Sequence, residues 1–155
     1  MTLIEIRSEF ETSIRRALPE YNLFGAKVTR IALSELPCIN LYFHKDCLGS
    51  KRNGYDDRHV TFVIEACFKP ESDPELEQVR IWDRIDKELR LNTSLFELVT
   101  SLTIEDVDLG HDMVGEIRVA ALQINVRLFY QRLYPSVPER LDPKQIIVNG
   151  EIINV

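Results

Sequence analysis

Three metal-capable side chains, His44, Cys47 and His59, gather in one stretch of this sequence. The spacing between His44 and Cys47 would suit a pair of zinc ligands. A structural zinc site takes four ligands, however, and the sequence supplies no second close pair. We therefore interpret these residues as strand and loop positions that happen to be near one another, and we predict that the protein has no metal site.

Nucleophilic catalysis is the second chemistry to consider, with His44, His59 and His111 as the three histidines of the chain. Such catalysis needs a serine or cysteine beside a histidine that a carboxylate orients. The sequence has no Gly-x-Ser-x-Gly elbow and no glycine-rich phosphate loop. We interpret the histidines as surface residues.

Acidic residues cluster in two places, Asp56 with Asp57, and Glu105 with Asp106 and Asp108. Such groups could form acid–base or cation-binding pairs. Carboxylates in turns are more often solvated or capping groups, because aspartate accepts hydrogen bonds from nearby backbone N–H groups. We expect that role here, and therefore no catalytic residue, no cofactor and no enzyme activity.

One basic, aromatic-bearing patch stands out in an acidic chain. It consists of Lys45, Lys51, Arg52, Tyr55 and Arg58. Most of it lies in a polar stretch over residues 45–57 that is rich in turn-forming residues, which predicts a mobile loop. The functional interpretation is a loop that docks an acidic partner or contacts DNA passing nearby, and the alternative is solvated loop charge.

The composition indicates one domain that avoids nucleic acid and membranes. A chain of 155 residues, 45% of them hydrophobic, can close one core without disulfides or metal, so the cysteines are expected to be reduced. The 25 acidic and 19 basic residues give a net charge of −6, which opposes binding to phosphate backbones. The chain starts without a signal-peptide pattern, and no apolar run approaches the roughly 20 residues that span a bilayer, so we expect a cytosolic protein.

The elements that must position these residues begin with a helix and several strands. Apolar residues at helical spacing predict a helix over residues 3–18, which Pro19 ends. β-Forming and alternating residues predict strands over 28–33, 38–44 and 59–68. The last two strands should pair as a hairpin with a long loop.

A second helix should follow Asp73, because an aspartate before Pro74 is an N-cap with proline at the first helical position. The apolar stripe that this helix is expected to bury consists of Leu76, Val79, Trp82, Ile85 and Leu89.

The remaining elements of the domain are a short helix and two strands. Ser94 and Glu97 have the capping-box spacing, which predicts a short helix. A strand over 102–109 and a turn over 110–115 should follow. Alternation over 116–134 predicts a strand far longer than the usual 5–6 residues, which should be the backbone of the sheet.

Residues 135–155 form a C-terminal arm of different composition. Prolines interrupt its first part, and Asn149-Gly150 between two apolar runs is a strong hairpin signal. An isolated hairpin is barely stable, and its apolar groups need burial either on its own domain or on a neighbouring copy. The candidate interaction residues of the arm are Ile147, Val148, Ile152 and Ile153.

Together these elements predict an α+β fold. We expect a mixed, mainly antiparallel sheet of about four to five strands with two main helices packed on one face. Residues 1–134 should form the domain, and residues 135–155 the arm with its β-hairpin.

The element order resembles the tail terminator family of tailed bacteriophages, which includes the minor tail protein U of siphophages. The resemblance covers about residues 1–134. It rests on the amphipathic opening helix with Ile14 to Leu18, and on the long strand over 116–134 after a glycine-containing turn. Three further segments carry it: Leu36-Pro37-Cys38-Ile39-Asn40-Leu41-Tyr42, Asp57-Arg58-His59-Val60-Thr61-Phe62-Val63-Ile64, and the helix from Leu76 to Leu89 with Trp82-Asp83-Arg84-Ile85 at its centre.

This resemblance implies a structural virion protein that is made in the host cytoplasm and becomes part of the tail. Its relatives form a closed ring, usually a hexamer, on the head-proximal end of the tail tube, end tube polymerisation and present the surface to which the head binds. The implied partners are copies of this chain, the tail tube protein and head–tail connector proteins, with DNA at most passing through the ring lumen. The alternatives are another phage neck or tail-completion component, a related secretion-tube part, or a small α+β hydrolase or ligand-binding domain.

A metal chelator should leave the thermal midpoint of unfolding unchanged, because the sequence contains no complete ligand set for a structural metal. Calorimetry with and without chelator, together with metal analysis of the purified protein, checks this. A large fall in the midpoint accompanied by stoichiometric zinc would contradict it.

Overall fold

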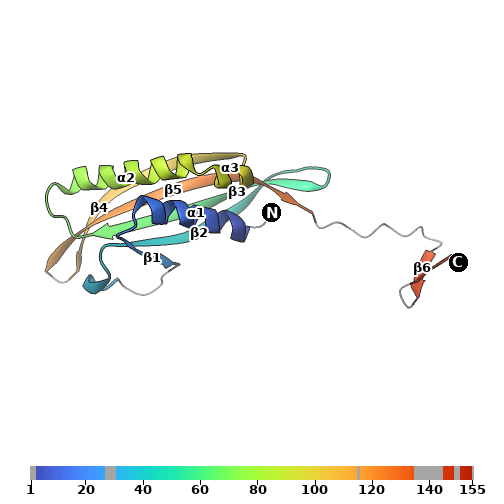
Figure 1. Cartoon of the computed structure of the whole chain (residues 1–155), viewed down its shortest axis with the longest axis horizontal. Helices are drawn as coiled ribbons and strands as arrows, with labels where there is room; N and C mark the ends of the chain where they lie inside the picture. The colour runs from blue at the N-terminus through green and yellow to red at the C-terminus, as the bar shows by residue number, and fades with distance from the viewer. Residues whose placement is uncertain (1–2, 27–30, 115, 135–144, 149–150, 155) are drawn as a thin grey trace.

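The protein is an α+β domain in which helices cover one face of a five-stranded sheet (Figure 1). The computed structural model describes residues 3–26, 31–114, 116–134, 145–148 and 151–154. The helices are α1 (Leu3–Ala17), η1 (Leu33–Glu35), α2 (Pro74–Leu91) and α3 (Thr93–Leu98). The strands are β1 (Asn22–Gly25), β2 (Cys38–Lys51), β3 (Tyr55–Phe68), β4 (Ser101–Val114), β5 (Ile117–Leu133), β6 (Gln145–Val148) and β7 (Glu151–Asn154).

The main sheet is mixed but mostly antiparallel, as the sequence predicted. Its strand order is β1-β2-β3-β5-β4, and only the pairing of β1 with β2 is parallel. The register places Tyr42, Val63, Asn125 and Asp106 in one row across the four long strands.

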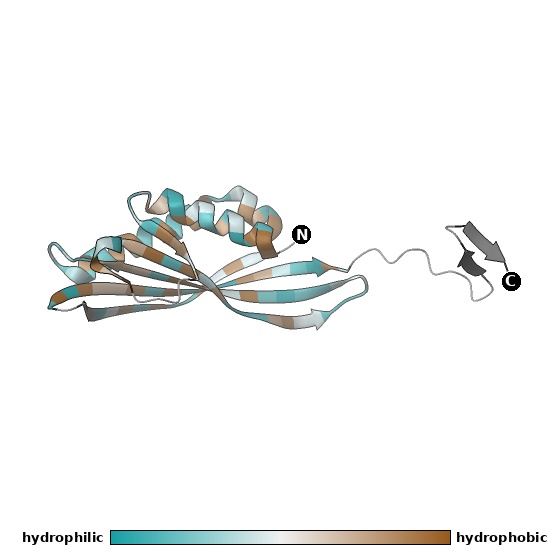
Figure 2. Cartoon of the chain, turned by 90° about the horizontal axis from the view of Figure 1, so that it is seen from below, coloured by the Kyte–Doolittle hydropathy of each residue, from teal (hydrophilic) through white to brown (hydrophobic). Residues whose placement is uncertain are grey.

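The core lies between the helices and one face of the sheet. The β5 residues at alternate positions from Ala120 to Tyr130 are buried, as their two-residue period predicted. Phe10 of α1 stacks on Phe62 of β3 with ring centroids 4.5 Å apart. Figure 2 shows the alternation as bands of hydrophobic and hydrophilic colour along the strands.

One buried asparagine joins the three α-helices. Asn92 ends α2, and its side chain accepts a hydrogen bond from the backbone N–H of Leu95 at 2.9 Å, which caps the start of α3. Its amide also donates to the carbonyl oxygen of Glu9 at 3.0 Å and to the hydroxyl of Ser13 at 2.8 Å, both on α1. The N-cap of α3 is therefore Asn92, and not the Ser94 that the capping-box spacing indicated.

The prediction of a long mobile loop over residues 45–57 is wrong, because most of that stretch is strand. β2 runs to Lys51 and β3 begins at Tyr55, where the backbone N–H of Arg52 donates to the carbonyl oxygen of Tyr55 at 2.9 Å. The local backbone explains why glycine occupies these two positions within a hairpin. Gly54 adopts a positive φ of 91° in the turn, and Gly49 lies at a register shift where a Cβ would stand 3.0 Å from the backbone oxygen of Asp57.

One other strand prediction and one turn prediction need correction. Leu33, at the end of the strand predicted over 28–33, begins the helix η1, and residues 27–30 lie outside the described residues. The edge strand beside β2 is β1, which is too short for periodicity to reveal. The turn predicted over 110–115 is also wrong at its start, because Gly110 lies inside β4, which continues to Val114.

Helix α2 begins at Pro74 with Asp73 as N-cap, as predicted, and Ile85 and Leu89 of the expected stripe are buried, but the N-terminal part of the buried face is rotated from that stripe. Leu76 and Val79 remain 46% and 41% exposed. The helix instead buries Gln78, whose amide donates to two backbone carbonyl oxygens of the sheet, those of Gly110 and Ala121.

The C-terminal strands form a two-stranded antiparallel sheet of their own. Ile147 lies opposite Ile152, and Val148 lies opposite Glu151. This pairing is the hairpin that Asn149-Gly150 predicted, although these two turn residues lie outside the described residues.

Replacing Asn92 by alanine should lower the free energy of unfolding by about 2–3 kcal/mol, because it removes a helix cap and leaves buried polar partners unsatisfied. Chemical denaturation measures the change. Asp73→Ala is the control and should cost about 1 kcal/mol, since the exposed Asp73 side chain caps its own helix by accepting from the backbone N–H groups of Glu75 and Leu76. Equal losses in both variants would contradict the joining role of Asn92.

Candidate functional site

The polar end of the β2–β3 hairpin is held by ion pairs, and this is where most of the predicted basic patch lies. Arg58 Nε lies 3.2 Å from Asp46 Oδ2, and Arg58 Nη1 lies 3.7 Å from Asp56 Oδ2. The hydroxyl of Tyr130, which is otherwise buried, donates to Asp46 Oδ1 at 3.0 Å. Burial raises the pKa of Tyr130 to about 12, and the hydrogen bond to Asp46 adds to this effect.

A second group of contacts lies nearer the turn. Arg52 Nε lies 2.9 Å from Asp57 Oδ2, to which Ser50 Oγ also donates at 3.0 Å. The hydrogen bond from Arg52 is the main reason that the pKa of Asp57 lies below its usual range. Tyr134, after β5, donates its hydroxyl to Asp56 and its backbone N–H to the carbonyl oxygen of Gly54.

The structure therefore divides the predicted patch. Arg52 and Arg58 are neutralised by aspartates of the same hairpin, and Tyr55 is half-buried opposite Leu133. Lys45 and Lys51 are exposed on β2. The positive charge available to a partner is thus spread along the β2 edge instead of being concentrated in a loop.

The face of the sheet opposite the helices carries a shallow polar hollow of about 360 Å³. On this face Tyr42 donates to Glu65 Oε1 at 2.8 Å, and Arg127 forms an ion pair with Glu105. Burial raises the pKa of Tyr42 to about 12, with the hydrogen bond to Glu65 acting in the same direction. The residues that line the hollow are Tyr42, His44, Lys45, Thr61, Val63, Glu105, Gln123, Asn125 and Arg127.

The metal-capable residues of the sequence lie along the same hairpin. Cys47 and His59 are cross-strand neighbours, and the His59 ring lies 5.5 Å from the Phe129 ring, centroid to centroid. His44 is exposed at a register shift of β2. Among the described residues, no group of three or more His, Cys, Asp or Glu side chains is placed to hold a metal ion.

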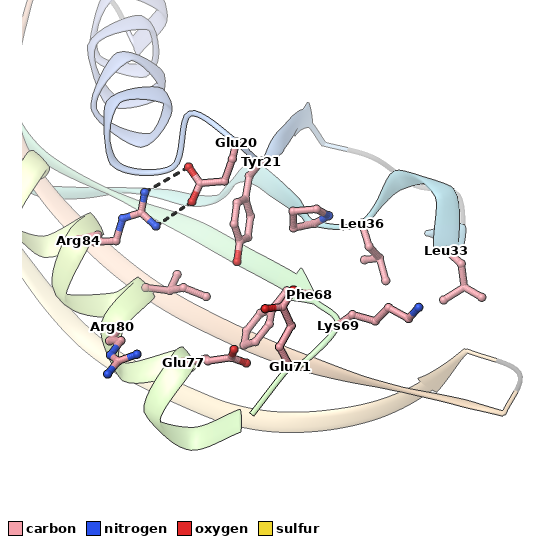
Figure 3. Close-up of a pocket in the computed structure, with 12 residues that line it drawn as sticks. Glu20, Tyr21, Leu33, Leu36, Phe68, Lys69, Glu71, Glu77, Arg80 and Arg84 are labelled. Atoms are coloured by element: carbon pink, nitrogen blue, oxygen red, sulfur yellow. Dashed lines mark hydrogen bonds and ion pairs between the residues drawn. The ribbon is translucent and has the colours of Figure 1, made fainter. Parts of the chain in front are cut away.

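A larger pocket, of about 630 Å³, lies between the N-terminal part of α2 and the segment around Tyr21 (Figure 3). Arg84 forms two hydrogen bonds with Glu20, at 2.8 and 3.2 Å, along one wall. Burial raises the pKa of Tyr21 to about 12, and Glu77 Oε2 is buried without a hydrogen-bond partner in the described part of the chain. The described lining residues are Glu20, Tyr21, Leu33, Leu36, Pro37, Phe68, Lys69, Glu71, Glu77, Arg80, Ile81 and Arg84.

This pocket was not predicted from the sequence. Glu20 and Arg84 are 64 positions apart, so no local spacing connects them. The described lining includes no serine, threonine, cysteine or histidine. Its charged side chains are of both signs, three glutamates beside one lysine and two arginines.

Comparison with models of known protein families gives no match for this chain, and neither does comparison with curated proteins. None of the helices in the described residues is both long enough and apolar enough to cross a membrane.

Tyr21, Tyr42 and Tyr130 should ionise near pH 12. In an ultraviolet pH titration, the tyrosinate absorbance of these three residues should therefore be delayed, which means that it appears at a higher pH than that of an ordinary tyrosine. The pKa of each of these tyrosines is higher in the folded than in the unfolded protein. Their contribution to the free energy of unfolding is therefore fully present below about pH 10 and is lost as the pH rises towards 12.

Tyr42→Phe identifies one part of this signal, because it removes the hydroxyl that donates to Glu65 while keeping the ring. The variant should show a smaller delayed signal than the native protein. Complete ionisation of all tyrosines near pH 10, with the protein still folded, would contradict the assignment.

Proposed function

We propose that this protein is a structural virion component that forms a ring on the head-proximal end of a phage tail tube, ends tube polymerisation and provides the surface for head joining. The observation that carries the proposal is the one-sided sheet. Its helices cover a single face, which leaves the opposite face and the polar ends of β2, β3 and β5 available for contacts between chains (Figure 1).

The order of elements supports this proposal. An amphipathic helix, the β2–β3 hairpin, a capped helix, a short helix and the long strand β5 occur in the order of the resemblance to tail terminators. The match is incomplete, because the strand expected over 28–33 is not found in its described residues 31–33 and β4 lies between α3 and β5. The hairpin differs from that expectation only in being paired almost to its turn.

A ring that caps a tube needs two kinds of contact, a lateral one that closes around the ring and an axial one to the tube. The described domain offers separate surfaces for them. The sheet has two outer edges, and the β2–β3 hairpin carries a charged end with exposed Lys51 and Arg52. The residues proposed for partner contacts in the arm are Ile147, Val148, Ile152 and Ile153.

A ligand-binding domain is the second candidate, and the pocket beside Arg84 is the observation that favours it. Its volume of about 630 Å³ falls in the roughly 300–1,000 Å³ range of small-molecule sites. The oxygen of Glu77 that has no hydrogen-bond partner among the described residues, together with the exposed positive charges of Lys69 and Arg80, would favour a zwitterionic ligand over an apolar one.

The solution mass separates the two candidates. A ring protein should sediment far above the 18.0 kDa of one chain, alone or with tail tubes, and should show closed rings by negative-stain electron microscopy. A protein that stays monomeric with and without tubes would contradict the ring proposal and favour the ligand-binding one.

Deleting residues 135–155 should leave a folded domain that no longer forms rings or restores tails of normal length in a complementation assay. Burial on a neighbour of five apolar side chains of the arm would stabilise the contact by roughly 1.5–3 kcal/mol each before ordering costs. These five are Ile146, Ile147, Val148, Ile152 and Ile153. Circular dichroism checks folding, and electron microscopy checks rings and tail lengths.

A second truncation after Lys144 serves as the matched control, because it removes β6 and β7 but keeps the preceding segment. It should behave like the full deletion. Normal rings and tails from either truncation would exclude the arm from the contact, and unfolding of both would show that the arm packs on its own core.

A further inference from the structure

The main sheet has two long outer stretches with which no strand of the described residues pairs. β1 pairs only with the first four residues of β2, so no described strand pairs with the outer edge of β2 from Tyr42 to Lys51. At the opposite side, β4 (Ser101–Val114) pairs with β5 alone, and no described strand pairs with its outer edge. Each edge therefore presents a row of backbone N–H and C=O groups.

These two edges carry charges of opposite sign. On β2, the exposed Lys45 and Lys51 have no salt-bridge partner within the described residues. On β4, the same holds for the exposed Asp106 and Asp108, whereas Glu105 is paired with Arg127.

The charged stretches of the two edges also lie at similar positions along the strand direction. The register across the four long strands places Tyr42 in the same row as Asp106, and Lys45 in the same row as Thr103. Lys45 and Asp106 are therefore only a few residues apart along the strand direction, although they lie at opposite edges. β2 and β4 run in opposite directions, because β2, β3, β5 and β4 are successively antiparallel. A second copy in the same orientation would therefore present its β2 antiparallel to β4 of the first.

We propose that the partner of each sheet edge is a second copy of this chain. The β2 edge of one copy lies antiparallel against the β4 edge of the next, with Lys45 facing Asp106. This inference rests on the proposed ring and names its lateral contact. The contact is head-to-tail, since it joins two different surfaces, and such a contact generates a ring when its rotation closes.

Charges on edge strands commonly serve to prevent pairing with other chains. Here the opposite signs make that protection selective. Two β4 edges repel each other through Asp106 and Asp108, and two β2 edges repel each other through Lys45 and Lys51. Only the unlike edges attract, which favours a head-to-tail ring over a two-fold symmetric dimer.

Charge exchange between copies tests this contact. Lys45→Glu and Asp106→Lys, each alone, should lose the ring in sedimentation at low salt, with apparent affinity reduced on the order of tenfold or more by the like charges. Mixing the two variants should restore rings in which they alternate, because every contact then joins unlike charges. The chain with both substitutions should also form rings by itself.

The matched controls are Lys87→Glu and Asp83→Lys, which make the same charge changes on exposed positions of α2. Both should keep the wild-type ring. Thermal melting confirms that all variants are folded, and any edge variant that fails to fold is replaced by Lys45→Gln or Asp106→Asn, which should weaken the ring less.

The outcomes separate this inference from the proposed function. Wild-type rings that persist in both edge variants, or that are lost without recovery on mixing, would overturn the edge contact and leave the ring proposal standing. A wild-type chain that remains at 18.0 kDa at all concentrations, and with tail tubes present, would overturn both.

Discussion

Phe62, at the centre of the sheet, packs between Phe10 of α1 at 4.5 Å and Phe43 of β2 at 4.3 Å, measured between ring centroids. This aromatic contact fixes which face of β3 is buried, and the two-residue period of a strand then assigns every neighbouring position to one face or the other. Because the helical layer covers one face only, the other face can carry polar side chains such as Tyr42, Gln123 and Asn125. The open hollow around Arg127 is a consequence of the same constraint.

The sequence predicted the elements whose apolar period is regular and whose ends carry local signals. Helix α1, the start of α2 at Asp73 and the alternation of β5 are of this kind. It did not predict the polar ends of β2 and β3, where strand formation depends on backbone pairing and ion pairs between strands and not on an apolar face. The rotation of α2 was missed for a similar reason, because Gln78 is buried through hydrogen bonds to two distant carbonyl groups of the sheet.

The candidate sites show the same division between local and long-range information. The sequence showed that basic side chains gather in this segment, but it could not show that Arg58 forms ion pairs with Asp46 and Asp56. The pocket that contains Glu20 and Arg84 depends on contacts between segments far apart in the chain, so composition and spacing carry no sign of it. Tail-tube capping remains our proposal.

The β2–β3 hairpin has a final consequence that concerns the cost of association. A flexible loop loses about 1–2 kcal/mol of conformational entropy for each residue that a partner orders. The hairpin is already paired to within a few residues of its turn, and Arg52, Arg58 and Tyr134 hold it to neighbouring groups. A partner that binds this end therefore meets a preorganised surface, so even a small contact area there can be effective.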